Sequence, residues 1–243
     1  FPNFLGQNVT LQAYNNNVKD FFQTGGTYMN SVSFEGGNEN SDYRASFAST
    51  NQTGIISGQS LDRYNVGFNG GRSFNEKLNV RSSINYVKTK ASGRPVQSSN
   101  DPNILTTTIY GLPRTVDINQ LKNNYVDPIT GAQISLTPDK TGNNPYWIIN
   151  NNTNNGDLER MYGNAVVAYS TVKWLSISNN LGVDFYTESR MNITRKGTFG
   201  ALDGQFSTDV IKNRILNNDL LISAQTKLTH DLDLKATLGH NIN

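Results

Sequence analysis

The sequence predicts an all-β fold, an antiparallel, up-and-down transmembrane β-barrel of which the 243 residues supply a part. Three observations lead to this prediction. Apolar and polar residues alternate with a period of two in about eight runs, the pattern of strands with one apolar face. Two runs alternate without interruption for about ten residues, enough to cross the apolar layer of a bilayer at the tilt of a barrel strand. Short and long connections follow in turn, as in outer-membrane barrels with short periplasmic turns and long extracellular loops.

Composition excludes several other classes of protein. The hydrophobic share is 35% and the charged share 16%, both low for a soluble globular domain. The net charge is +2, which gives no strong electrostatic case for nucleic acid or an anionic surface as a partner. Cysteine is absent, so disulfides and thiolate sites are excluded. No run of about eighteen apolar residues predicts a transmembrane helix, but barrel strands are only half apolar and need no such run.

The N-terminal part contains four predicted strands. Residues 27–34 and 42–50 are joined by a short turn, and the polar residues 75–77 make the turn of the hairpin 64–89. Within each run the apolar side chains fall on one face: Tyr28, Val32, Phe34, Tyr43, Ala45, Phe47, Tyr64, Val66, Phe68, Phe74, Leu78, Val80, Ile84 and Tyr86.

A long segment, residues 91–159, interrupts this alternation. It contains most of the prolines and an Asn-rich run, so it is predicted as a long extracellular loop within a single barrel domain, 1–243. Short helices are expected at 103–111 and 117–123.

Alternation resumes beyond the loop with four more predicted strands: 165–169, 174–186, 216–228 and 232–242. Their connections are short, long and short: 171–173, 189–208 and 229–231. Aromatic residues near both ends of the runs are typical of the interfacial girdles of barrels: Tyr28, Tyr64, Tyr86 and Phe185 at one end, and Phe34, Phe74 and Trp174 at the other.

Four stretches resemble the barrel of the SusC/RagA family, the TonB-dependent outer-membrane transporters of Bacteroidetes. They are VKDFFQTG (18–25), SVSFEGGNENSDYRASFASTNQTGII (31–56), FNEKLNVRSSINYVKT (74–89) and KWLSISNNLGVDFY (173–186). The resemblance extends over most of residues 18–186. It implies a middle portion, about eight strands, of a 22-stranded barrel in the cell outer membrane.

The resemblance also implies a function and partners. Such transporters import nutrients, typically an oligosaccharide or a peptide. A SusD-like surface lipoprotein closes over the extracellular side, and the TonB–ExbB–ExbD complex supplies energy through N-terminal parts that cannot be placed in this sequence.

No catalytic constellation is found. HExxH, GxSxG and P-loop patterns are absent and only two histidines occur, so the chain is not predicted to be an enzyme, and no cofactor or metal is expected. Asp127, Asp139 and Asn143 lie in a Gly-containing stretch whose spacing fits no known calcium loop. Ordinary turn chemistry is the preferred interpretation there.

Two sets of residues are candidates for contact with cargo. Aromatic faces stack on sugar rings and Asn side chains bond to hydroxyl or peptide groups, which makes the aromatics of the long loop candidates: Tyr110, Tyr125, Tyr146 and Trp147. The alternative is that these aromatics fold the loop or pack on a lid protein. The polar face should line the barrel lumen through Arg44, Arg81, Asn85, Asn180, Asp184 and Lys235.

Two other functions fit the same pattern of residues. A passive porin-type channel would have the same wall without energy coupling. A soluble or surface-anchored all-β binding module, such as an adhesin, would instead place Leu175, Ile177, Leu181, Val183 and Phe185 in a dry protein core.

Overall fold

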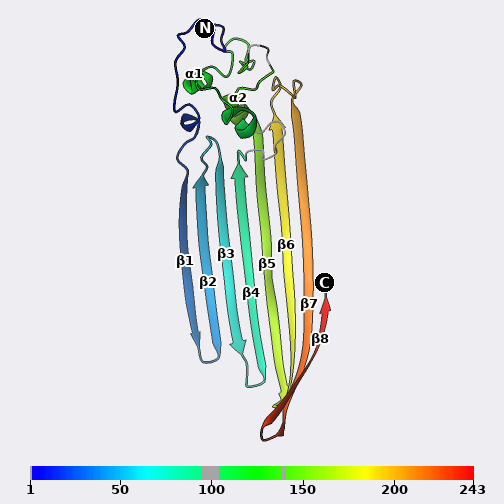
Figure 1. Cartoon of the computed structure of the whole chain (residues 1–243). Helices are drawn as coiled ribbons and strands as arrows, with labels where there is room; N and C mark the ends of the chain where they lie inside the picture. Colours follow the sequence, from blue (N-terminus) through cyan, green and yellow to red (C-terminus); the bar gives the residue numbers. More distant parts are fainter. Residues whose placement is uncertain (1, 95–103, 138, 140) are drawn as a thin grey trace.

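A computed structural model describes residues 2–94, 104–137, 139 and 141–243 of the chain (Figure 1). Eight strands form one sheet: β1 (Gly26–Asn38), β2 (Ser41–Thr53), β3 (Ser60–Ser73), β4 (Leu78–Ser92), β5 (Thr153–Val172), β6 (Leu175–Thr194), β7 (Gln205–Thr229) and β8 (Leu232–Ile242). The described helices are short: η1 (Lys19–Phe21), η2 (Leu105–Ile109), α1 (Ile118–Asn123) and α2 (Pro145–Asn151). Among the described residues, no helix is both long and apolar enough to cross a membrane.

The strands follow one another in chain order across the sheet, β1 to β8, and each pairs with the next in antiparallel fashion. The sheet is therefore an up-and-down meander, as predicted. All tight turns lie at one end: 39–40, 74–77, 173–174 and 230–231. The longer connections lie at the other end, beside the helices (Figure 1): 54–59, 93–152 and 195–204. The alternation of short and long connections is confirmed.

Asparagine side chains shape two of the tight turns. The Asn38 Oδ1 atom accepts hydrogen bonds from the backbone N–H groups of Asn40 and Ser41, each at 2.9 Å. The Asn75 Oδ1 atom accepts from Lys77 and Leu78 at 2.9 and 2.8 Å. An Asn that bonds to its own backbone two and three residues on stabilises a turn locally, which suits a two- to four-residue connection.

Several strands are longer than the alternation indicates. The predicted loop 91–159 is reduced at both ends, because β4 continues to Ser92 and β5 begins at Thr153. Likewise, the predicted loop 189–208 contains the end of β6 and the start of β7. The β5 extension is polar on both faces apart from Leu158, and the added ends of β6 and β7 carry few apolar residues, Met191, Ile193 and Phe206. Backbone pairing holds these ends, for example Asn154 with Asn192 and Asn192 with Ser207. A strand without an apolar face gives no period-two signal.

The register aligns the apolar sides of all eight strands into one continuous face. Phe34 is opposite Ala45, Ala45 opposite Phe68, and Phe68 opposite Ile84. The same row continues through Gly163, Val183 and Leu216. Many of these side chains are exposed in the described structure, with Phe34 at 70% and Leu216 at 57%. No described element packs over this face.

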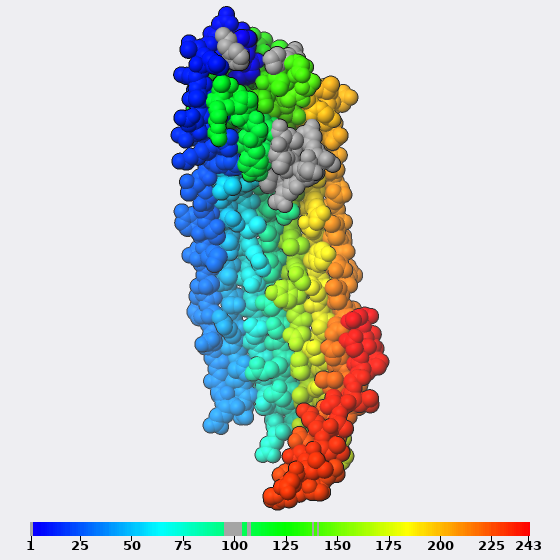
Figure 2. Space-filling view, viewed as in Figure 1, coloured from blue at the N-terminus to red at the C-terminus, as the bar shows by residue number. Residues whose placement is uncertain are grey.

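The buried apolar core lies outside the sheet, in a cap at the end with the long connections. The cap is built from the N-terminal segment, the connection 54–59, the described residues between 104 and 151 and the connection between β6 and β7, and it lies at one end of the strands only (Figures 1 and 2). Its buried members come from distant parts of the chain: Phe21, Ile56, Ile104, Ile109, Leu112, Ile118, Leu121 and Tyr146. The Asn17 side chain, 1% exposed, joins two of these parts by donating to the Pro113 carbonyl oxygen at 2.8 Å.

The helices of the cap agree in part with the sequence prediction. The expected helices at 103–111 and 117–123 are found as η2, a π-helical turn, and α1, whose first turn is capped by Asp117. The helix α2 was not predicted. Asn144 caps α2 and Pro145 occupies its first turn, a combination that favours a helix start.

Gly163 occupies a position in β5 where a side chain cannot be accommodated. A Cβ atom there would collide with the backbone carbonyl of Ser83 and lie 2.9 Å from the Ile84 Cα atom. We expect Gly163→Ala to lower the free energy of unfolding by about 1–3 kcal/mol, because a backbone clash is relieved only by moving β4 from β5. Urea unfolding of the refolded full-length protein measures the change. Gly182→Ala is the matched control, since its Cβ would have 3.7 Å of clearance, and an equal loss in both variants would contradict the argument.

Candidate functional site

The candidate site is the polar face of the sheet, opposite the apolar face. Strand alternation and register place all six predicted polar-face residues on it: Arg44, Arg81, Asn85, Asn180, Asp184 and Lys235. The face is not an unstructured polar surface. Its side chains bond to one another across strands, and glycines between them make room for these contacts.

Near the tight turns, Arg81 of β4 reaches across β3 to form an ion pair with Asp42 of β2. Gly71 of β3 is the register partner of both residues, and a Cβ atom there would lie 2.9 Å from the Arg81 Cγ atom. The glycine therefore opens the path for the arginine. Both charged side chains are more than half exposed, so this pair positions charge and contributes little to stability.

Farther along the wall, Arg160 of β5 pairs with Asp184 of β6. The Arg160 Nε and Nη2 atoms donate to the two carboxylate oxygens of Asp184 at 2.9 and 2.5 Å, a bidentate arrangement. The guanidinium also lies over the Tyr162 ring, 5.1 Å from its centroid. Asp184 was predicted as a polar-face residue, whereas Arg160 was missed because it lies just past the end assigned to the long loop.

Amide side chains extend this network toward β8. Asn164 donates to the Asn180 Oδ1 atom at 3.0 Å, and Asn180 donates to Asp219 at 3.3 Å. Asn241 of β8 donates to the other oxygen of Asp219 at 2.6 Å. Asp219 thus collects amide donors from two neighbouring strands, and the wall here presents a row of amides around one carboxylate.

A shallow hollow of about 360 Å³ lies within this row. Most of its lining comes from side chains that point to the polar face: Ser83, Asn85, Tyr162, Asn164, Asp184 and Asn217. It offers amide and hydroxyl groups, one aromatic ring and one carboxylate. Such a set can bond to the hydroxyls of a sugar or to peptide groups, and the ring supplies a stacking surface.

A second cavity, of about 250 Å³, lies where the wall meets the cap. Ile104, Ile148 and Ile149 form its apolar side, and Arg94, Asn154 and Asn192 are among its polar lining. Arg94 lies against Gly156 and approaches Glu188 at 4.0 Å, while Arg190 donates to both oxygens of Glu188 at 2.8 Å. Two guanidinium groups therefore share one carboxylate, which leaves positive charge beside the cavity.

The four loop aromatics lie in two different environments. Trp147 is fully buried, and its indole Nε1 donates to the Thr198 Oγ1 atom at 2.9 Å, while Tyr146 is 5% exposed and packs edge-on against Phe21. Tyr125 packs on the rim of the same core, and Tyr110 is 64% exposed. The burial of Tyr146 and Trp147 favours the alternative in which aromatics fold the loop. Contact between cargo and any of the four stays a prediction.

Asp127 and Asp139 take part in turn chemistry. Asp127 accepts from the backbone N–H groups of Ile129 and Thr130, each at 2.8 Å, and these bonds hold the pKa of its carboxyl below the usual range. Bonds from Thr137 and Thr141 likewise lower the pKa of Asp139. Within the described ranges, no group of three His, Asp or Glu side chains is placed to hold a metal ion.

Known proteins match this chain in structure. No protein-family model matches the chain, and no curated protein matches it by sequence. Solved structures do match: a chain of the RagAB peptide importer in its open-open state superposes with a TM-score of 0.72 over 93% of this chain, at 18% identity. The closed-closed state gives a TM-score of 0.70 at 17% identity over 93% of this chain, and the RagAB peptide transporter 0.72 at 18% over 94%.

The chain has the fold of a segment of a RagA-like barrel. It covers 25% of the length of each matched RagAB chain, so it corresponds to about a quarter of that polypeptide. The predicted fold class, an antiparallel all-β part of a larger barrel, is therefore confirmed. Within the described residues, the eight RagA-like strands form an open sheet, with one free edge on β1 and the other on β8 and on residues 205–217 of β7, which have no partner on that side.

The Tyr146 hydroxyl provides a test of the packing of the cap. Burial, with a smaller effect from Asp20, raises the pKa of Tyr146 to about 12. Between about pH 10 and 12, the Tyr146 hydroxyl is therefore protonated in the folded state and ionised in the unfolded state, in which its pKa is near 10. The contribution of the protonated Tyr146 hydroxyl to the free energy of unfolding is complete below about pH 10, and it is lost as the pH rises toward 12. We expect Tyr146→Phe to lack this loss, measured by the absorbance of tyrosinate and by hydrogen exchange of α2 between pH 9 and 12. Identical pH profiles in both proteins would contradict the assignment.

Proposed function

We propose that this chain is part of the wall of an outer-membrane nutrient importer and has no enzymatic role. In this proposal the apolar face contacts membrane lipid, and the polar face lines the transport path. The tight turns are periplasmic, and the cap, with the connection 93–152, is extracellular. The whole protein is TonB-dependent, works with a SusD-like surface lipoprotein, and takes up a peptide or an oligosaccharide.

One observation supports this proposal most directly. The apolar face is continuous over eight strands in register, and nothing in the described structure covers it. In a soluble binding module of the adhesin type, Leu181 and its neighbours would lie in a dry core, yet Leu181 is 46% exposed. A lipid-facing wall explains an exposed apolar face of this extent, which a soluble monomer would not tolerate.

The likeness to the RagAB structures supports the choice of an importer over a general channel. Those structures are described as a peptide importer, and the polar hollows of this chain carry amide, hydroxyl and arginine groups suited to peptide or sugar cargo. A SusD-like partner and a peptide cargo fit that likeness. Energy coupling by TonB–ExbB–ExbD rests on the sequence resemblance.

Uptake experiments on the full-length protein test the proposal. Cells expressing the protein should accumulate labelled peptides or oligosaccharides, and accumulation should stop when TonB is removed. Uptake that continues without TonB would support a passive porin-type channel instead. Absence of uptake, together with a protein that stays monodisperse without detergent, would support a surface binding module.

A further inference from the structure

A hollow on the apolar face has the composition of a lipid-headgroup site. Its volume is about 480 Å³, and most of its lining residues point to the same side as the apolar row. It is separate from the two polar cavities described above, which belong to the opposite face and to the cap. Along the strands, it lies where the apolar face described above ends and polar residues begin.

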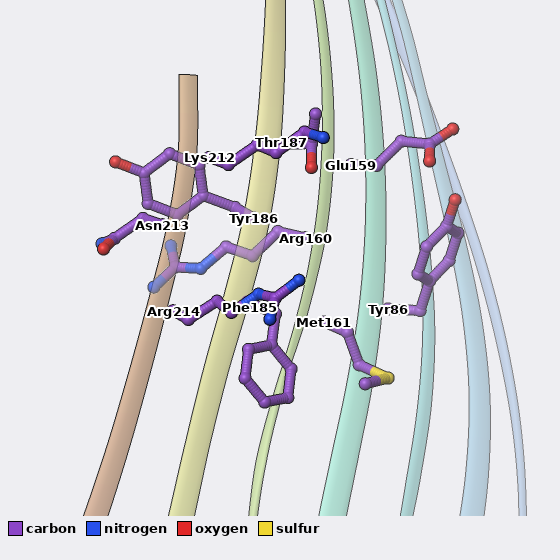
Figure 3. A pocket seen from close by; sticks show the side chains of 10 residues that line it. All are labelled: Tyr86, Glu159, Arg160, Met161, Phe185, Tyr186, Thr187, Lys212, Asn213 and Arg214. Carbon is purple, nitrogen blue, oxygen red and sulfur yellow. The ribbon is translucent and has the colours of Figure 1, made fainter. Parts of the chain in front are cut away.

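Two adjacent rows of register-paired side chains mark the boundary between the apolar and the polar part of this side of the sheet. The row nearer the tight turns consists of Tyr86, Met161, Phe185 and Arg214, which are register neighbours from β4 to β7. The row above, toward the cap, contains Lys88, Glu159, Thr187 and Lys212. In Figure 3, Phe185 and Met161 lie at the lower side of the hollow, and Lys212, Thr187 and Glu159 lie at the upper side. An apolar floor is thus bordered by a charged edge.

The charge at this edge is unbalanced. Three cations, Arg160, Lys212 and Arg214, and one carboxylate, Glu159, line the hollow. Arg160 is paired with Asp184, and Glu159 is paired with Lys88 at 2.7 Å. Lys212 and Arg214 are exposed, and within the described part of the chain neither makes an ion pair or a side-chain hydrogen bond. They stand two residues apart on the same side of β7, so both head groups can reach one anion.

Arg214 is unusual for its position. It continues a row of apolar side chains and is the direct neighbour of Phe185. An arginine on a bilayer-facing strand is costly unless its head group reaches the interface, and at the edge of the apolar band it can do so. Cations at this depth are attracted to anionic lipid headgroups, and a guanidinium bonds phosphate in bidentate fashion.

We propose that this hollow binds a membrane lipid whose headgroup carries phosphate and a net negative charge, as bis-phosphorylated lipid A does and phosphatidylcholine does not. Lys212 and Arg214 contact the phosphate, and Phe185 and Met161 contact the upper part of an acyl chain. Tyr86 closes the side toward β4. The proposal rests on the membrane location proposed above, and it assigns the site to the lipid-facing side of the wall, away from the cargo.

The test uses the full-length protein in phosphatidylcholine nanodiscs that contain either bis-phosphorylated lipid A or its dephosphorylated form. Native mass spectrometry counts the lipid A molecules that stay bound after release from the disc. We expect preferential retention of the phosphorylated form, and a decrease of about tenfold or more in the double variant Lys212→Gln, Arg214→Gln. The control variant Lys122→Gln, Lys235→Gln removes two positive charges from the cap and the polar face, and it should retain the lipid as the wild type does.

The possible outcomes separate the two proposals. Equal retention of both lipids, or an equal loss in the control variant, would overturn the lipid site while leaving the membrane location intact. A protein that does not enter the nanodiscs would overturn both proposals.

Discussion

Leu181→Arg is expected to lower the stability of the full-length protein by about 2–4 kcal/mol or to block its assembly. Leu181 is 46% exposed on the apolar face and lies opposite Ala165 and Asn218, near the middle of the apolar band. A guanidinium at this depth cannot reach either interface, and its register neighbours, Ala165 and Asn218, offer it no carboxylate. Val183→Arg, one position nearer the cap on the same face, should behave similarly. Heat-dependent gel mobility and urea unfolding in lipid vesicles measure the loss.

The matched control is Asn180→Arg, one residue away on the opposite face. Asn180 lies beside Asp219, which can pair with an introduced arginine, so we expect normal assembly and a stability close to that of the wild type. Equal tolerance at positions 180 and 181 would contradict the contact between Leu181 and lipid, and loss at 180 with tolerance at 181 would mean that the two faces are reversed. Equal loss at both would point to a wall buried on both sides.

Trp147→Ala is expected to cost the cap about 3–5 kcal/mol of local stability, because it removes the largest fully buried side chain of the described structure. The indole Nε1 atom bonds to Thr198, and the ring supports the Arg195 guanidinium at 5.3 Å, so the substitution also frees the connection between β6 and β7. Hydrogen exchange on the full-length protein should accelerate in α1, α2 and residues 195–204. Exchange in the lower halves of β4–β6 should not change.

Two further variants separate packing from hydrogen bonding in the cap. Thr198→Val removes the partner of the indole while keeping most of the volume, and it should produce a smaller acceleration confined to the connection between β6 and β7. Tyr110→Ala changes a side chain that is 64% exposed and should leave exchange unaltered. Unchanged exchange in Trp147→Ala would mean that the cap is not held by this core.

The faces of the sheet could be predicted from the sequence because a strand has a fixed period of two. The alternation of apolar and polar residues in Leu175–Phe185 therefore predicts on which face of the sheet each apolar side chain lies. The predicted apolar faces agree with the strand register in the row from Phe34 to Leu216. The ends of the strands could not be predicted in this way. Residues such as Asn154 and Asn192 continue the strands with polar side chains, where backbone pairing alone maintains the structure.

The cap was less predictable for a different reason. Trp147 is buried by Thr198 and Arg195, about fifty positions away in sequence, so no local pattern distinguishes it from an exposed loop aromatic. The start of α2, by contrast, carries a local signal, because Asn144 caps the helix and Pro145 follows it. The bidentate pair of Arg160 and Asp184 required both a correct strand start and the pairing of β5 with β6.

The polar extensions of β5, β6 and β7 have a mechanical consequence. Above the row of Thr187, β6 continues for seven residues to Thr194, paired with β7 throughout and with β5 as far as Ile193, which corresponds to roughly 20 Å of strand. In the membrane orientation proposed above, the cap therefore stands on a collar of paired strands beyond the outer leaflet, in place of single-chain tethers. A force applied to the cap by a closing partner would be transmitted along hydrogen-bonded strands into the wall, and it would reach the polar hollow around Asn164 and Asp184 without passing through a loop.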